Sequence, residues 1–238
     1  MPCFFGNLQA TKTIVIIGDS NVGNWLPALG LGLATSPYRL AVFMFSGCPL
    51  SSITFTSQMI DKAADCNTWH AAVPGAVQAL HPVAIVGVSE VFANSGIPPT
   101  RKNRTFSNAI WASGMTKFFN QVTGGNSSIK RILMGTTPHY PLSGPVICLS
   151  IHPNPSACAG SVMSGGASSY QATQQRDASV ASANGATFIP TASWFCTSAV
   201  CPSVVNGLIV SNDFDHTTIA YSEYLSTVAT TALEAAVQ

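Results

Sequence analysis

Ser20 is the residue around which a reaction can most readily be built. A β-branched apolar run at residues 14–17 predicts a buried strand, and Gly18 ends it where the chain must turn. Apolar residues at helical spacing over 21–33 place Ser20 at or just before a helix N-terminus, where an oxyanion would be stabilised. Ser20 acting only as a helix cap is the alternative, with Asp19 hydrogen-bonded to the turn.

A base for this hydroxyl lies near the other end of the chain. Asp213 stands three residues before His216, so a turn can bring the two side chains together. Asp213 would then accept from His216 Nδ1, while Nε2 faces Ser20 Oγ and takes its proton. Asp215 competes for the orienting role, and we favour Asp213 because adjacent side chains diverge. The spacing predicts nucleophilic catalysis by serine.

The elements that must position these groups alternate between strand and helix along the whole chain. This pattern predicts one α/β sandwich domain over residues 1–238, with a mainly parallel five-stranded sheet. Ligands bind where parallel strands end, so Ser20, Gly47 and Ser89 are expected to share one site. The predicted strands are 14–17, 40–45, 82–88, 129–135 and 186–190, and the predicted helices are 21–33, 65–80, 106–122, 168–184 and 218–237.

Composition excludes several classes of protein. The formal net charge is +1 and charged residues make up only 8% of the chain, so we expect no nucleic-acid partner. No apolar run reaches the roughly 18 residues that a membrane span needs. The N-terminus lacks the pattern of a signal peptide, and we expect a domain excised from a longer protein.

The seven cysteines favour an oxidising compartment. Six of them fall into locally spaced pairs in loop-like sequence, which we interpret from proximity as three disulfides and which leave Cys3 over; other pairings stay open. No CxxC motif occurs and the histidines are not clustered, so we expect neither a metal nor another cofactor. The pairs are Cys48 with Cys66, Cys148 with Cys158, and Cys196 with Cys201.

Together, Gly18-Asp19-Ser20 and Asp213-x-x-His216 resemble the SGNH (GDSL-type) hydrolases, which have a three-layer, flavodoxin-like α/β/α fold. The resemblance is strongest to the SGNH domains attached to bacterial membrane acyltransferases of the acyltransferase-three family. It rests further on the segments FSGCP at 45–49, CNTW at 66–69, WFC at 194–196 and CP at 201–202, and on the stretch 138–148. It implies that Ser20 is the nucleophile, His216 the base and Asp213 its orienter.

The resemblance also predicts an oxyanion hole, with one departure. The backbone N–H groups of Ser20 and Gly47 would contribute to it. The family usually has Gly-x-Asn-Asp where this chain reads Gly87-Val88-Ser89-Glu90. Ser89 or a backbone group is expected to replace the missing Asn. Losing such a donor typically costs about 2.7–4 kcal/mol of transition-state stabilisation. Glu90 is expected to be a solvated loop carboxylate.

Two further side chains have open roles. His139 follows the fourth predicted strand and either lines the pocket or is a loop histidine. Trp194 is expected to anchor the core or a loop, and stacking on a sugar is the alternative.

These features predict a serine esterase or O-acyltransferase that works outside the cytoplasm. Its substrates would be short acyl esters, such as acetyl esters, of cell-surface carbohydrate. The parent protein would supply a membrane acyltransferase domain as partner. One alternative is a glycan-binding or acceptor-presenting module with a vestigial triad. Another is an independent secreted lipase or esterase.

Overall fold

The computed structural model describes residues 2–57, 59–90, 108–141, 144–163 and 169–238. The predicted starts of two helices, at residues 106 and 168, lie outside these ranges. Within them, no helix is long and apolar enough to span a bilayer.

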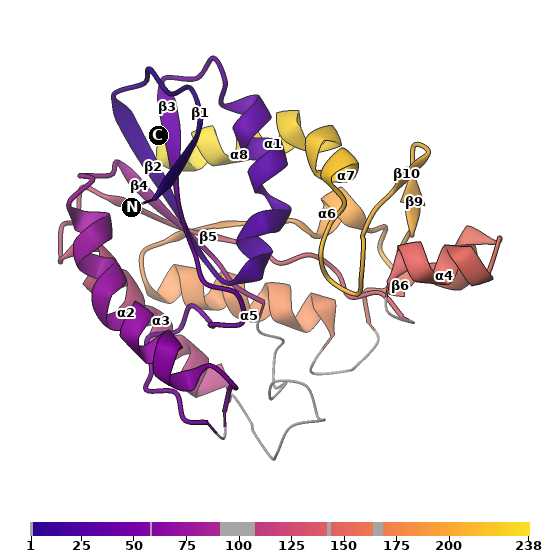
Figure 1. The fold of residues 1–238 in the computed structure, drawn as a ribbon, viewed down its shortest axis with the longest axis horizontal. Coiled ribbons are helices and arrows are strands. Elements are labelled where there is room, and N and C mark those ends of the chain that lie inside the picture. Colours follow the sequence, from indigo (N-terminus) through magenta and orange to yellow (C-terminus); the bar gives the residue numbers. More distant parts are fainter. Residues whose placement is uncertain (1, 58, 91–107, 142–143, 164–168) are drawn as a thin grey trace.

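A six-stranded sheet forms the centre of the molecule, with strand order β1-β3-β2-β4-β5-β7 (Figure 1). All neighbouring strands are parallel except β1, which runs antiparallel to β3. The bounds are Cys3–Gly6 for β1, Lys12–Gly18 for β2, Tyr38–Met44 for β3, Ala84–Val88 for β4, Lys130–Met134 for β5 and Thr187–Ile189 for β7.

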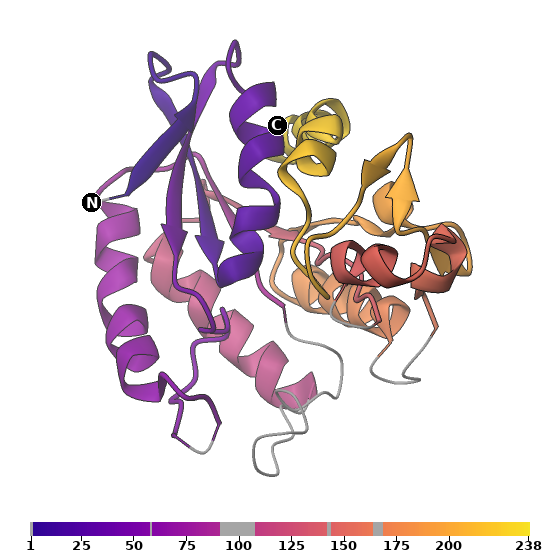
Figure 2. The same ribbon diagram turned by 45° about the vertical axis from the view of Figure 1, so that its right-hand side comes forward.

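Helices cover both faces of this sheet, which gives three layers (Figure 2). One face carries α1 (Leu26–Gly32), α7 (Ile219–Tyr224) and α8 (Ser226–Val237). The other carries α2 (Ala63–Gln78), α3 (Asn108–Thr123) and α5 (Tyr170–Ala183). The predicted α/β/α sandwich is confirmed.

The alternation of side chains along β2 divides the core into two clusters. Ile14 and Ile16 pack toward α1 and α8, whereas Val15 and Ile17 pack toward α2 and α3. All four side chains are fully buried. This two-sided burial explains why β2 reads as a continuous apolar run.

The structure differs from the sequence prediction at the N-terminal edge. The sheet has six strands instead of five because β1 pairs with β3, in the register Cys3 with Val42. Residues 3–5 of β1 are exposed, so the strand has no buried pattern that sequence analysis could detect. Its position depends on tertiary pairing alone.

Several predicted loops and helices are also more finely divided. The closing helix is split at Leu225 into α7 and α8. The long segment from residue 136 to 166 contains α4 (Pro145–Ile151), the 3-10 helix η2 (Pro155–Cys158) and β6 (Gly160–Ser161). The segment from 194 to 210 carries the end of α6 (Ala192–Phe195) and the short strands β8 (Val200–Cys201), β9 (Val204–Val205) and β10 (Leu208–Ile209). Figure 2 shows α4 and the β9–β10 hairpin beside the sheet layers.

Candidate active site

The Ser20 turn, residues 18–25, follows directly from the end of β2. A Cβ atom on Gly18 would lie 1.6 Å from the Val88 carbonyl oxygen, so only glycine lets β2 and β4 approach this closely. Asp19 caps the next element by accepting a hydrogen bond from the Asn21 N–H at 2.9 Å. Asp19, and not Ser20, is therefore the cap, which leaves the Ser20 hydroxyl available for chemistry.

Ser20 is the first residue of a 3-10 helix, η1 (Ser20–Asn24), and not of a long α-helix. The α-helix α1 begins only at Leu26. A helix thus begins at Ser20 as expected, but it is only five residues long. Its dipole stabilises an oxyanion less than the predicted 13-residue helix would.

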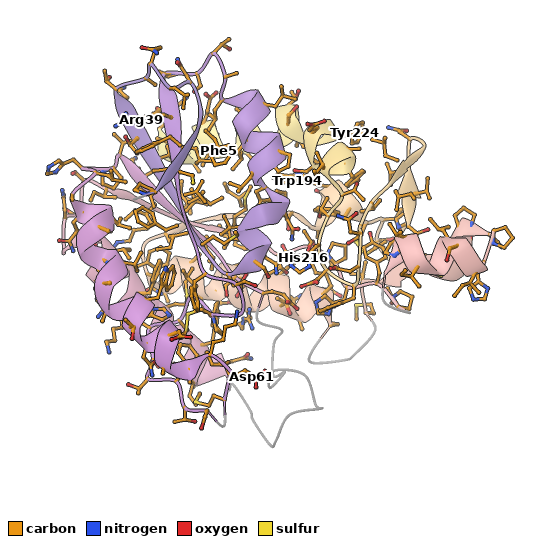
Figure 3. All side chains as sticks on the ribbon, in the orientation of Figure 1. Phe5, Arg39, Asp61, Trp194, His216 and Tyr224 are labelled. Carbon is orange, nitrogen blue, oxygen red and sulfur yellow. A yellow bond between two sulfur atoms is a disulfide. The ribbon has the colours of Figure 1, made fainter. Side chains whose placement is uncertain are left out.

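The His216 loop, residues 210–218, brings the second predicted group to this turn. His216 Nε2 lies 3.0 Å from Ser20 Oγ, although the two residues are 196 positions apart. The ring is partly buried at the lower end of α1, beside the carboxyl ends of the strands (Figure 3). This contact is the one that proton transfer from the serine requires.

Two carboxylates, and not one, face the other ring nitrogen. Asp213 Oδ2 accepts a hydrogen bond from His216 Nδ1 at 2.8 Å. Asp215 Oδ1 forms an ion pair with the same nitrogen at 3.1 Å. The expectation that the adjacent Asp215 side chain diverges is wrong, because Asp213 Oδ1 accepts from the Asp215 and His216 N–H groups and bends the loop back on itself.

The two carboxylates differ in burial. The Asp213 side chain is 45% exposed and that of Asp215 only 2%. The Asp215 carboxylate beside Nδ1, opposed by partial burial and assisted by Asp213, raises the pKa of His216 to about 9. Burial acts to raise the pKa of Asp215, but its contacts with His216 and Glu90 outweigh burial and lower it to about 2.

Besides Ser20, the two expected contributors to an oxyanion hole differ in their surroundings. Gly47 lies in an exposed turn after β3, closed by a Cys48 N–H to Phe45 oxygen bond of 3.1 Å. The Ser89 hydroxyl is buried, donates to Asp19 Oδ2 at 2.7 Å and accepts from the Leu50 N–H at 3.1 Å. Ser89 therefore braces the Ser20 turn, and its hydroxyl is already engaged.

Glu90 is not the solvated loop carboxylate that the sequence predicts, because it pairs with His139, whose role the sequence left open. The Glu90 side chain is 21% exposed, and its Oε1 lies 2.5 Å from His139 Nε2. Trp194 packs edge-on against Trp25 with ring centroids 5.6 Å apart, as expected for a core anchor.

Two polar residues that sequence reasoning missed hold the His216 loop in place. The Asn24 amide donates to the Asp215 carbonyl at 3.1 Å and accepts from the Thr217 N–H at 2.9 Å. The Thr137 hydroxyl donates to the same carbonyl at 2.6 Å. Both side chains are buried. The sequence signal for the first is weak: Asn24 stands directly before the apolar residues Trp25 and Leu26.

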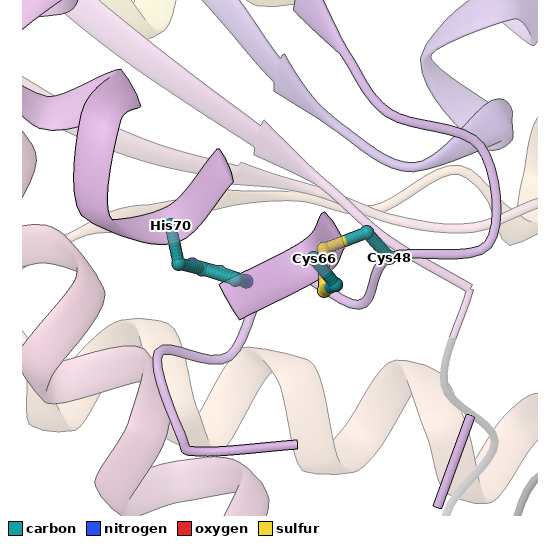
Figure 4. A group of neighbouring side chains, drawn as sticks. All are labelled: Cys48, Cys66 and His70. Carbon is teal, nitrogen blue, oxygen red and sulfur yellow. A yellow bond between two sulfur atoms is a disulfide. The ribbon is translucent and has the colours of Figure 1, made fainter. Parts of the chain in front are cut away.

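The six paired cysteines form the three expected disulfides, Cys48–Cys66, Cys148–Cys158 and Cys196–Cys201. Cys3 is free and exposed. Figure 4 shows that His70 lies next to the first bridge. His70 donates from Nε2 to the Pro49 carbonyl at 2.9 Å, which fixes the segment after Gly47.

Among the described residues, two groups of side chains have the donor types of a cation site, apart from His70 with Cys48 and Cys66, whose sulfurs are joined in a disulfide. They are Glu90 with His139 and Asp215, and Asp213 with Asp215 and His216. In both, short imidazole–carboxyl contacts already join the donor atoms. The expectation of a metal-free site stays a prediction.

Solved structures share this fold at low sequence identity. The periplasmic domain of a Salmonella ser. Paratyphi A lipopolysaccharide acetyltransferase superposes with a TM-score of 0.71 at 14% identity, over 93% of this chain and 83% of that one. The aryl esterase of M. smegmatis gives a TM-score of 0.57 at 14% identity, over 94% and 99% of the two chains. A carbohydrate acetylesterase from Sinorhizobium meliloti also gives 0.57, at 13% identity and the same coverage.

No curated protein sequence matches the chain. The family described as "SGNH domain (fused to AT3 domains)" matches residues 1–230, which is nearly the whole sequence and includes both the Ser20 turn and the His216 loop. On this match the chain belongs to the SGNH domains of the kind that are fused to AT3 domains.

Proposed function

We propose that this domain is a serine esterase or O-acyltransferase that acts on short acyl esters, with acylated cell-surface carbohydrate as the substrate. The observation that carries the proposal is the 3.0 Å contact between Ser20 Oγ and His216 Nε2, with Asp213 and Asp215 at the opposite ring nitrogen. Such a relay serves acyl transfer through a covalent intermediate.

In the proposed reaction, Ser20 Oγ attacks the acyl carbonyl carbon while His216 Nε2 takes the hydroxyl proton. The carbonyl oxygen becomes an oxyanion, which the backbone N–H groups of Ser20 and Gly47 would stabilise. The carbon–oxygen bond to the alcohol then breaks, and His216 returns the proton to the departing alkoxide. Water or a sugar hydroxyl attacks the Ser20 ester in the second half of the reaction and regenerates the free serine.

Three features support the wider assignment. The family is fused to AT3 domains, which supports a membrane acyltransferase in the parent protein. Three disulfides favour an extracytoplasmic location. A periplasmic lipopolysaccharide acetyltransferase domain and a carbohydrate acetylesterase share the fold, which supports a carbohydrate ester as substrate.

The test is hydrolysis of an aryl acetate by the domain and by Ser20→Ala. We expect the substitution to lower kcat by about 10⁴-fold or more. Ser179→Ala is the matched control, because that exposed serine lies on α5 and bonds only to the Gln175 carbonyl. Equal rates for wild type and Ser20→Ala would refute the proposal, and saturable glycan binding by Ser20→Ala would then favour a binding module.

A further inference from the structure

A second imidazole–carboxyl pair lies behind the Ser20–His216 contact and has no part in the reaction described so far. His139 Nε2 and Glu90 Oε1 are 2.5 Å apart, and one donor atom from each of Glu90, His139 and Asp215 lies within 4.8 Å of the others. The side chains of His139 and Glu90 are 34% and 21% exposed. Asp215 links this pair to the His216 ring.

The pair is anchored to both halves of the site. The Glu90 N–H donates at 2.8 Å to Asp19 Oδ2, the carboxylate that caps the Ser20 turn. On the other side, the Tyr140 N–H donates at 2.8 Å to the Phe214 carbonyl of the His216 loop. The His139 ring also packs edge-on against Phe214, with centroids 5.1 Å apart. Glu90 and His139 thus meet where the two halves are joined.

The charges around the pair limit how its protons can be arranged. Six ionisable groups face one another here: Asp19, Glu90, His139, Asp213, Asp215 and His216. Burial and then the nearby Asp215 carboxylate raise the pKa of Glu90 well above its ordinary value. Burial lowers the pKa of His139 to about 4. Burial therefore favours the uncharged form of both side chains.

Uncharged His139 and Glu90 side chains can form every hydrogen bond in the series from His139 through Glu90 to Asp215. His139 can donate from Nε2 to Glu90 Oε1. A protonated Glu90 can in turn donate to the Asp215 carboxylate, since donor atoms of the two side chains lie within 4.8 Å of each other. Asp215 keeps its negative charge toward His216. An ionised Glu90 would instead place a second buried carboxylate against Asp215, at a high electrostatic cost.

We propose that Glu90 and His139 are positioning residues: as an uncharged, hydrogen-bonded pair they hold the Asp215 carboxylate against His216. This role rests on the proposed acyl transfer at Ser20. Neither residue touches the reacting atoms, so their effect passes through Asp215 to the ring nitrogen of His216.

The test compares Glu90→Gln with Glu90→Leu in the pH profile of aryl acetate hydrolysis. Gln is an uncharged mimic that can still donate to Asp215, so we expect the profile midpoint to stay where the wild type has it. Leu removes the donor, so Asp215 becomes more basic; we expect the midpoint to rise and kcat to fall about tenfold. His139→Phe keeps a ring but loses the N–H, and we expect a smaller change in the same direction.

A second readout does not depend on turnover. The titration of ¹⁵N-labelled histidine, with His216 assigned by its loss in His216→Gln, reports the pKa of that ring in each variant. Thermal unfolding shows whether each variant is folded. A lower His216 pKa in Glu90→Gln would mean that a negative charge was removed, and it would overturn the proposal. The proposal would also be overturned if Glu90→Leu and His139→Phe both kept the wild-type rate of hydrolysis and the wild-type pKa of His216.

The two proposals fail in different ways. A wild-type domain without Ser20-dependent hydrolysis refutes the proposed function, while the histidine titration still decides whether Glu90 acts on His216 through Asp215. Ser20-dependent hydrolysis that is insensitive to Glu90 and His139 refutes only the positioning role.

Discussion

The Ser20 turn and the His216 loop position the two proposed reacting groups by different physical means. In the Ser20 turn, Asp19 caps η1, and the Val22 N–H donates to the Asp19 carbonyl at 3.2 Å. Ser89 and the Glu90 N–H, at the end of the adjacent strand β4, brace the Asp19 carboxylate. The His216 loop is held by Asn24 and Thr137, which lie 78 to 193 positions away from their partners in it. The serine is thus placed by the ends of two adjacent strands of the sheet, whereas the imidazole depends on polar contacts that reach a loop outside the sheet.

The backbone packing around the two segments repeats this contrast. Gly18 is in contact with β4, a neighbouring strand of the same sheet. Gly144, just before α4, lies so close to Asp213 that a Cβ atom would sit 2.1 Å from the Asp213 carbonyl group. The His216 loop is therefore sensitive to changes in a segment that no strand or long helix fixes.

Removing both carboxylates that face His216 should cause the largest loss of turnover. We expect Asp213→Asn with Asp215→Asn to lower kcat by about 10⁴-fold, because the ring loses both groups that select its tautomer. Each single exchange should cost less, since one carboxylate remains, and Asp215→Asn should cost more than Asp213→Asn because Asp215 is buried and contributes most to the His216 pKa. Aryl acetate kinetics check this order. Full loss in Asp213→Asn alone would make Asp213 the sole orienting group.

The pH dependence sharpens the same comparison. His216 accepts the serine proton only when neutral, and its pKa is raised to about 9. We therefore expect kcat/KM to rise about 100-fold from pH 7 to a plateau above pH 9, and the midpoint to fall in either Asp variant. Hydrolysis by Ser20→Ala at each pH corrects for the spontaneous reaction. A plateau already reached at pH 7 would contradict the pairing of His216 with two carboxylates.

The same shift has a consequence for folding. Since the pKa of His216 is raised above the ordinary 6.5, its protonated form stabilises the folded state fully below that pH. This contribution is lost as the pH rises through about 9. The domain thus gives up some stability in the range where His216 becomes an effective base.

Asn24 tests whether distant contacts position the imidazole. Asn24→Ala leaves the buried Thr217 N–H without its acceptor, at a cost of about 1–3 kcal/mol of stability. We expect kcat to fall about 10- to 100-fold, because the His216 loop loses both of its hydrogen bonds to Asn24 and the imidazole shifts relative to Ser20. Asn7→Ala is the matched control, since its amide also donates to a backbone carbonyl but far from the site. Similar turnover in the two variants would show that Asn24 is not needed to place His216.

The sequence predicts the chemistry of both segments but the geometry of only one. The continuous apolar run of β2 and the glycine that ends it suffice to locate Ser20, because both are local features of the sequence. The approach of Asp215 to His216, and the pairing of Glu90 with His139, depend on how residues 90, 139 and 215 meet in space. No periodicity or spacing in the chain encodes that meeting, and β1 was missed for the same reason.

The disulfides provide the smallest expected effect on turnover. Cys48–Cys66 spans 18 positions beside Gly47, on the Ser20 side, and Cys196–Cys201 spans five positions near Trp194. Loop-closure entropy predicts losses of about 3 and about 2 kcal/mol when each pair is replaced by serine, or roughly 6–12 and 4–8 °C in Tm. Thermal unfolding and aryl acetate turnover measure both effects.

Turnover should separate the two disulfides more clearly than Tm does. The Cys48–Cys66 variant should lose up to about tenfold in kcat, because Gly47 is freed from its place in the proposed oxyanion hole. The Cys196–Cys201 variant should keep nearly wild-type turnover, since the Asn24 and Thr137 contacts still hold the His216 loop. A larger loss of turnover in the second variant would mean that the short bridge, and not those buried polar contacts, fixes the imidazole.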